Sequence, residues 1–122
     1  MSKAVLLVED NDFIRNMYQL KLAKAGLSVT EAVDGRMALD KVKQAKPDLM
    51  LLDLMMPNMN GIEVLTELKK EKLLPDLPVI VLTNVMDAQT IEQAKSLGAR
   101  DYVVKTDLTP SQVVDKLRPY LK

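Results

Sequence analysis

The sequence predicts an α/β protein built on an open, doubly wound, five-stranded parallel sheet with five helices. Five short apolar segments alternate with five segments that have helical patterns, and the connections between them are short. The apolar segments are hydrophobic throughout rather than at alternate positions, which is typical of parallel strands covered on both faces. Right-handed crossovers between such strands place helices on both sides of the sheet.

The first unit combines a strand at Ala4–Val8 with a helix at Asp12–Ala25. Gly26 is a typical residue for the end of a helix, so we expect the helix to end there. We expect this helix to have an apolar stripe, formed by Phe13, Met17, Leu20 and Ala23.

The second unit begins with a weaker strand at Leu27–Ala32. Its helix is expected at Gly35–Ala45, because Asp34 is a good N-cap and Pro47 stops the helical pattern. The third strand, Leu49–Asp53, follows directly.

The third helix begins with a capping box, in which Asn60 is the N-cap and Glu63 stands at the third helical position. We expect this helix to run to about Lys70. The fourth strand is predicted at Val79–Leu82, because the segment is rich in β-branched residues.

The last two helices flank the fifth strand. One is expected from about Asp87 to Leu97, with Gly98 at its end, and the strand follows at Asp101–Lys105. The run Thr109-Pro110-Ser111-Gln112 combines an N-cap, a proline at the first helical position and a glutamine at the third, so it opens the final helix.

The composition excludes several classes of protein. The 122 residues suit one domain spanning residues 1–122, and 48% hydrophobic with 28% charged residues can form a core. The net charge is zero, so nothing indicates a nucleic-acid or membrane-surface partner. Cysteine and histidine are absent, which excludes disulfides, thiol nucleophiles, most zinc sites and histidine catalysis. No segment approaches the ~18 apolar residues of a membrane span or resembles a signal peptide, so we expect a cytoplasmic location.

Polar side chains stand where the predicted strands end. Glu9-Asp10 follows the first strand, Asp53 ends the third, Thr83-Asn84 follows the fourth and Lys105 ends the fifth. Ligands of open parallel sheets bind at the carboxyl ends of the strands, so these side chains are expected to meet at one edge. This placement explains how a carboxylate can follow four apolar residues in a buried strand, where an unpaired charge would be costly.

Three carboxylates at one edge repel one another unless a cation lies between them. Oxygen ligands without histidine or cysteine favour a hard ion, so Mg²⁺ is the expected cofactor, with Mn²⁺ as an alternative. Together with Lys105, the ion would neutralise an incoming phosphoryl group. An accessible carboxylate beside them can act as a nucleophile and form an acyl phosphate.

These features resemble a response-regulator receiver domain of two-component signalling, as in single-domain chemotaxis regulators, and the resemblance covers essentially the whole chain. It rests on five features in order: Glu9-Asp10, Asp53, the run D-x-x-M-P-x-M-x-G from Asp53 to Gly61, Thr83, and the run G-A-R-D-Y-V-V-K from Gly98 to Lys105. It implies a flavodoxin-like three-layer fold with the strand order 2-1-3-4-5. It also implies a signalling domain rather than an enzyme.

The resemblance implies a role for each site residue. Asp53 would accept a phosphoryl group from the phosphohistidine of a sensor kinase or phosphotransfer protein, and Lys105 would pair with the phosphoryl oxygens. Asp10, Asp53 and the backbone carbonyl of Met55 would bind Mg²⁺, with Glu9 acting through a metal-bound water. Glu9 stands where aspartate is commoner in the family.

A switch is also implied by the resemblance. Thr83 would donate a hydrogen bond to the phosphoryl group, and Tyr102 would move into the space vacated near it. The readout would be the surface of the fourth helix, fifth strand and fifth helix. No output domain follows the last helix, so we expect the output to pass to a downstream protein, unless the chain is a domain of a longer protein.

Other functions remain open at this point. A phosphatase of the haloacid dehalogenase type would need a second aspartate two positions after Asp53, where Met55 stands. A P-loop nucleotide binder would need a G-x-x-x-x-G-K run, which the sequence lacks. A flavin-binding protein of the same topology would leave Asp53 and Lys105 unexplained. A receiver-shaped docking module that is never phosphorylated is the fourth alternative.

Overall fold

The structure, a computed structural model, describes residues 3–74, 76–84 and 88–121. In this part of the chain five strands alternate with five α-helices, and a short 3-10 helix, η1, follows at Arg118–Leu121. The strands are β1 (Ala4–Val8), β2 (Ser28–Ala32), β3 (Leu49–Asp53), β4 (Val79–Thr83) and β5 (Asp101–Val104). The helices are α1 (Asp12–Lys24), α2 (Gly35–Gln44), α3 (Gly61–Lys70), α4 (Ala88–Leu97) and α5 (Pro110–Leu117).

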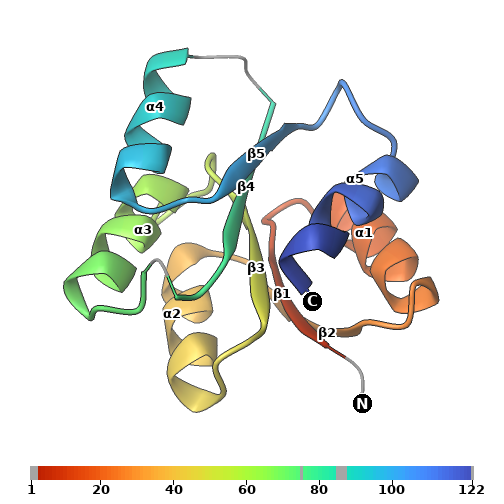
Figure 1. Ribbon diagram of the computed structural model, residues 1–122, viewed down its shortest axis with the longest axis horizontal. Coiled ribbons are helices and arrows are strands. Elements are labelled where there is room, and N and C mark those ends of the chain that lie inside the picture. The colour runs from red at the N-terminus through yellow and green to blue at the C-terminus, as the bar shows by residue number, and fades with distance from the viewer. Residues whose placement is uncertain (1–2, 75, 85–87, 122) are drawn as a thin grey trace.

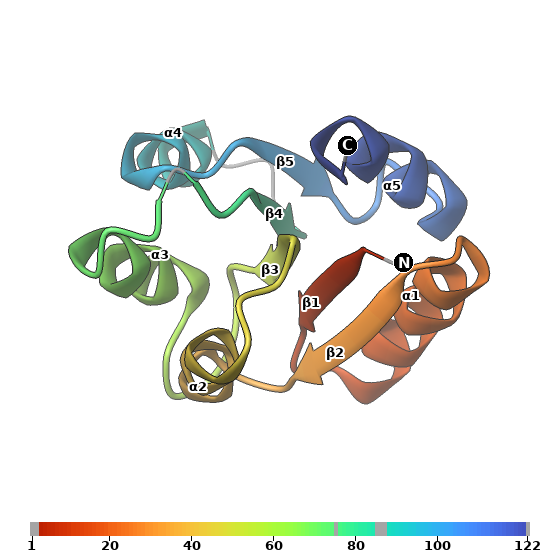
Figure 2. The same ribbon diagram turned by 60° about the horizontal axis from the view of Figure 1, so that its bottom comes forward.

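The strands form one parallel sheet in the order β2-β1-β3-β4-β5, which confirms the predicted fold class and strand order. The helices lie on both faces of this sheet. Figures 1 and 2 show α1 and α5 on one face and α2, α3 and α4 on the other. The result is a three-layer molecule in which all five strands end at the same edge.

The predicted element boundaries agree with the structure to within one residue where it describes them. Thr83 belongs to β4, and Lys105 lies just beyond β5. The predicted start of the fourth helix at Asp87 lies outside the described residues. The predicted capping box at Asn60 is present, and the predicted N-cap Thr109 forms a second one with Gln112, each with reciprocal hydrogen bonds.

The predicted apolar stripe of α1 is wrong. Phe13 is 78% exposed and Leu20 is 55% exposed, while Ala23 is also exposed and Met17 is only half-buried. The buried residues of α1 are Tyr18 and Leu22, with Ile14 packed beside them. The helix carries two apolar stripes, and the one that packs against β1 and α5 is buried.

Two apolar layers fill the space between the sheet and its helices. Alternate residues of β1 enter different layers: Leu6 and Val8 pack with α2 and α3, whereas Val5 and Leu7 pack with α1 and α5. This alternation follows from the two-residue period of a strand. None of the helices in the described ranges has the length and apolar content that a membrane span requires.

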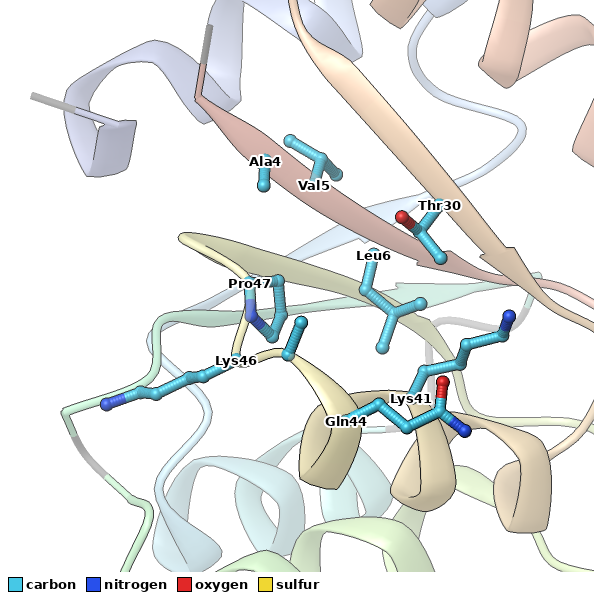
Figure 3. A pocket seen from close by; sticks show the side chains of 9 residues that line it. Ala4, Val5, Leu6, Thr30, Lys41, Gln44, Lys46 and Pro47 are labelled. Carbon is cyan, nitrogen blue, oxygen red and sulfur yellow. The ribbon is translucent and has the colours of Figure 1, made fainter. Parts of the chain in front are cut away.

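A cavity of ≈ 230 Å³ lies at the amino-terminal edge of the sheet (Figure 3). Ala4 and Val5 of β1, Thr30 of β2 and the end of α2 line it, with the Lys41 and Gln44 side chains at its border. Ala4 opens β1, whereas the acidic pair follows the end of β1. The cavity therefore lies at the opposite edge from the predicted site.

Candidate functional site

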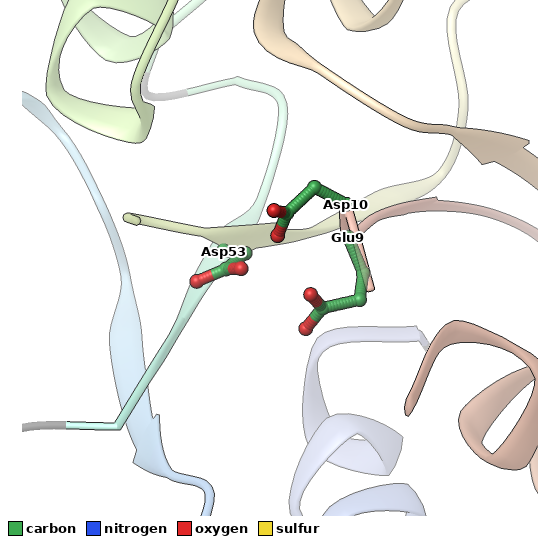
Figure 4. Close-up of side chains that lie close together, drawn as sticks. All are labelled: Glu9, Asp10 and Asp53. Carbon is green, nitrogen blue, oxygen red and sulfur yellow. The ribbon is translucent and has the colours of Figure 1, made fainter. Parts of the chain in front are cut away.

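The predicted acidic residues meet at the carboxyl edge of the sheet. Val8 of β1 is paired with Leu52 of β3, so Glu9 and Asp53, the next residue of each segment, stand side by side. Glu9, Asp10 and Asp53 each offer a carboxylate oxygen, and these atoms lie within 4.8 Å of one another. Figure 4 shows the three carboxyl groups between the ends of β1 and β3. Glu9 and Asp53 are buried, and Asp10 is exposed.

Lys105 reaches this cluster from two strands away, because β4 lies between β3 and β5. Its side chain is 7% exposed, and its ammonium forms an ion pair with Glu9 and a second one with Asp53, at 3.3 Å from Oδ2. The backbone N–H of Lys105 donates to the carbonyl of Thr83 at 2.7 Å, which fixes where the side chain begins. The direct pair between Glu9 and Lys105 was not predicted from the sequence.

The charges at the site do not balance, since two buried carboxylates face one ammonium. Burial raises the pKa of Asp53 to about 7, and the charge of Glu9 adds to this effect. The charge of Lys105 and a hydrogen bond from the Met55 N–H, 3.1 Å from Oδ1, oppose it. Burial lowers the pKa of Lys105, but its contacts with Glu9 and Asp53 outweigh burial, so the net pKa is raised and the amine stays charged.

The loop after β3 closes tightly on Asp53. The N–H of Gly61 donates to the carbonyl of Leu54 at 3.1 Å, which brings the start of α3 against the strand end. A Cβ atom at Gly61 would lie 2.7 Å from the carbonyl oxygen of Asp53, closer than atoms can pack. Glycine at this position therefore allows α3 to begin directly beside Asp53.

The donor set fits a hard divalent cation. All three side chains supply carboxylate oxygens, and a cation would offset the negative charge that Lys105 leaves uncompensated. Asp10 also borders an open hollow of ≈ 380 Å³ lined by the loop after β3, so water ligands have access. The carbonyl of Met55 as a ligand stays a prediction.

Thr83 and Tyr102 lie on the same face of the sheet. Thr83 ends β4 and is buried, and Tyr102 is half-buried in β5, where it is paired with Val81. Two ammonium groups lie near the Tyr102 ring: that of Lys95 is 5.2 Å and that of Lys116 is 5.3 Å from the ring centroid. The structure thus places Tyr102 near side chains of α4 and α5, and its switching role stays a prediction.

One residue close to the site was missed by the sequence analysis. The Arg15 guanidinium donates to the backbone carbonyl of Glu9 at 3.0 Å. An arginine in the first turns of a helix has many ordinary functions, so its spacing from Glu9 alone gave no signal.

Comparison with known proteins identifies the family. Residues 5–118 match the family described as the response regulator receiver domain. The chain is 38% identical over 123 residues to the chemotaxis protein CheY of Thermotoga maritima, covering all of both chains. It is 35% identical to the phosphate regulon transcriptional regulatory protein PhoB of Pseudomonas aeruginosa, of which it spans about half, 53%.

A solved structure gives the same result. Chemotaxis protein CheY4 of Vibrio cholerae superposes with a TM-score of 0.91 at 30% identity, with 99% of this chain and 100% of that one covered. The similarity therefore extends over essentially the whole fold. The chain is a member of the response regulator receiver domain family, the signalling domain of two-component systems.

Proposed function

We propose that residues 1–122 act as one phosphoacceptor domain, in which Asp53 accepts a phosphoryl group from a phosphohistidine. The donor is a sensor histidine kinase or a phosphotransfer protein, and the reaction depends on Mg²⁺, with Mn²⁺ as a substitute. The supporting observation is the placement of Asp53, which lies among acidic side chains and 3.3 Å from the Lys105 ammonium.

In the transfer, a carboxylate oxygen of Asp53 forms a bond to phosphorus as the phosphorus–nitrogen bond of phosphohistidine breaks. The electron pair of that bond stays on the imidazole nitrogen, and Asp53 becomes an acyl phosphate. Asp53 attacks as the carboxylate, so the raised pKa favours an unreactive protonated form until charge at the site changes. A bound Mg²⁺ would neutralise negative charge on the carboxylates and on the phosphoryl oxygens.

Side chains and one backbone carbonyl of the chain would bind the ion and the phosphoryl group. Asp10, Asp53 and the carbonyl of Met55 would hold the ion directly, and Glu9 would hold it through a water. Lys105 pairs with Glu9 and Asp53 in this structure, so its amine already lies where the phosphoryl oxygens would arrive. Transfer would replace part of this pairing by contacts with the new phosphoryl group.

The proposed output is a changed protein-binding surface. Phosphorylation would draw Thr83 toward Asp53 and let Tyr102 turn inward, away from Lys95 and Lys116. The surface of α4, β5 and α5 would then bind a downstream protein target. The proposal includes no direct contact with nucleic acid.

A phosphorylation assay tests the proposal. The protein is incubated with Mg²⁺ and acetyl phosphate and then weighed intact by mass spectrometry. We expect a gain of one phosphoryl mass, which Asp53→Asn and a chelator both abolish. Asp40→Asn removes an exposed carboxylate of α2 and serves as the matched control, with labelling equal to wild type. Absence of labelling in wild type would favour the unphosphorylated docking module.

A further inference from the structure

Arg15 joins three segments of the chain next to the acidic cluster. Its Nη1 donates to the carbonyl oxygen of Glu9 at 3.0 Å, beyond the end of β1. Its Nη2 pairs with Asp12 in the first turn of α1 at 2.6 Å, and its Nε faces Glu31 of β2 at 3.5 Å. The Arg15 side chain is only 15% exposed, so this arrangement is partly shielded from water.

The carbonyl that Arg15 holds belongs to the peptide bond between Glu9 and Asp10. A peptide unit is planar, so fixing its oxygen restricts the direction in which the Cα of Asp10 follows. The N–H of Glu9 donates to the carbonyl of Ala32, and the N–H of Asn11 donates to the Glu9 carboxylate, both at 3.1 Å. The backbone on each side of Asp10 is therefore anchored, although Asp10 itself is exposed.

By its charge alone, Arg15 would weaken the binding of a cation at the acidic cluster. A positive group near the acidic cluster repels a divalent cation. Asp12 and Glu31 offset only part of that repulsion, because the Asp12 side chain is 90% exposed and that of Glu31 is 43% exposed. What arginine adds is geometry, since its planar group donates to several acceptors in a fixed arrangement that lysine does not offer. The geometric and electrostatic effects of Arg15 thus have opposite signs.

We propose that Arg15 is a positioning residue for the divalent cation, acting through the Glu9–Asp10 peptide. The inference rests on the Mg²⁺ site of the proposed function and extends it to a residue that would not touch the ion. Groups that orient metal ligands commonly change metal affinity when they are removed.

The test is a Mg²⁺ titration by calorimetry on wild type, Arg15→Met and Arg15→Gln. We expect Arg15→Met to weaken Mg²⁺ binding roughly tenfold, as for other groups that orient metal ligands. Gln retains one donor for the Glu9 carbonyl without the charge, so Arg15→Gln should recover part of the affinity. If Arg15→Met binds Mg²⁺ as tightly as wild type or more tightly, the proposal is overturned.

Two controls separate positioning from general stability. Asp40→Asn removes an exposed carboxylate of α2 that is not among the contacts of Arg15, so its Mg²⁺ affinity should match wild type. Val42→Ala opens a space in the core under α2, so it should lower the melting temperature while leaving the affinity unchanged. Equal loss of affinity in Val42→Ala and Arg15→Met would refute a specific effect of Arg15.

The outcomes also separate this inference from the proposed function. If wild type does not bind Mg²⁺, both fall; if wild type binds and Arg15→Met is unchanged, only the inference falls. Should Arg15→Met not fold, Arg15→Lys carries the test. Lysine keeps the charge but lacks the planar group, so affinity should still fall, and an unchanged affinity would overturn the proposal.

Discussion

Asp53 combines burial with a partial excess of negative charge around it. Its carboxylate lies beside Lys105, but Lys105 also pairs with Glu9, so one ammonium serves two buried acids. Burial raises the pKa of Asp53 to about 7 from a usual value of 3.8, and the charge of Glu9 adds to this effect. The carboxyl group that is proposed to react is thus also a source of instability in the ion-free protein.

The raised pKa of Asp53 predicts a pH dependence of folding stability. The folded state binds the Asp53 proton more tightly than the unfolded state does. The stabilisation of the folded state by this proton is therefore fully present below pH 3.8 and is lost as the pH rises to about 7. In a chelator, Asp53→Asn should therefore gain stability relative to wild type across this window. Urea unfolding of both proteins at several pH values measures the difference, and a constant difference would contradict the prediction.

At the residue scale, the site residues could be predicted from the sequence because the apolar segments show where each strand ends. Glu9, Asp10, Asp53 and Lys105 each follow an apolar run, and parallel strands bring such positions to one edge. The pairing of Glu9 with Lys105 was not predictable in this way. It depends on rotamers and on the local charge balance, which become defined only when β1, β3 and β5 are in place.

Helix α1 shows how two apolar stripes can compete for the core. Phe13, Met17 and Leu20 have helical spacing, but so do Ile14, Tyr18 and Leu22. Contacts with α5 and the sheet select the second set, and a sequence pattern does not contain the position of α5. By contrast, capping boxes are local, so the starts of α3 and α5 were predicted correctly.

The burial of α1 gives a direct mutational test. Leu22→Ala should destabilise the protein by about 2–5 kcal/mol, because it leaves a cavity in the core. Phe13→Ala should change stability by less than about 0.5 kcal/mol, because the ring is largely in water. Equilibrium urea unfolding measures both free energies of unfolding. A larger loss of stability for Phe13→Ala than for Leu22→Ala would mean that the predicted stripe is the buried one.

The connection between β3 and α3 predicts a difference between two glycines. Gly61→Ala would force the start of α3 away from Asp53, with an expected loss of about 1–3 kcal/mol and weaker Mg²⁺ binding. Gly26 has a φ of +88° but open space around it, so Gly26→Ala costs roughly 1–2 kcal/mol of backbone strain. Because Gly26 ends α1 far from the acids, Mg²⁺ affinity should stay at the wild-type level. Calorimetric titration distinguishes the two variants, and an equal effect on Mg²⁺ affinity would count against the prediction.

For the whole molecule, the alternation of five strand and helix units was enough to predict a covered parallel sheet. The order β2-β1-β3-β4-β5 came from the resemblance and is confirmed. Periodicity alone does not give it, because each strand carries similar apolar residues and nothing in their pattern selects its neighbours. The two core layers follow from that order, since helices on opposite faces receive alternate residues of the same strand.

Mg²⁺ should stabilise the folded chain as a whole. A ligand that binds only the folded state raises the free energy of unfolding, by about 2.7 kcal/mol at 100 times its dissociation constant. Asp10→Asn should abolish most of this gain. Because Asp10 is exposed, the variant should unfold in chelator at nearly the same urea concentration as wild type. A full Mg²⁺ response in Asp10→Asn would remove Asp10 from the ligand set.

The contact between Glu9 and Lys105 joins residues 96 positions apart. The acidic pair leaves the ribosome early and the amine only near the end of synthesis, so a nascent chain holds the acids before the amine that pairs with them. The proposed phosphoryl transfer would therefore require synthesis of the chain past β5, where Lys105 lies. A copy that stops after β4 would hold the acids without the ammonium that pairs with them.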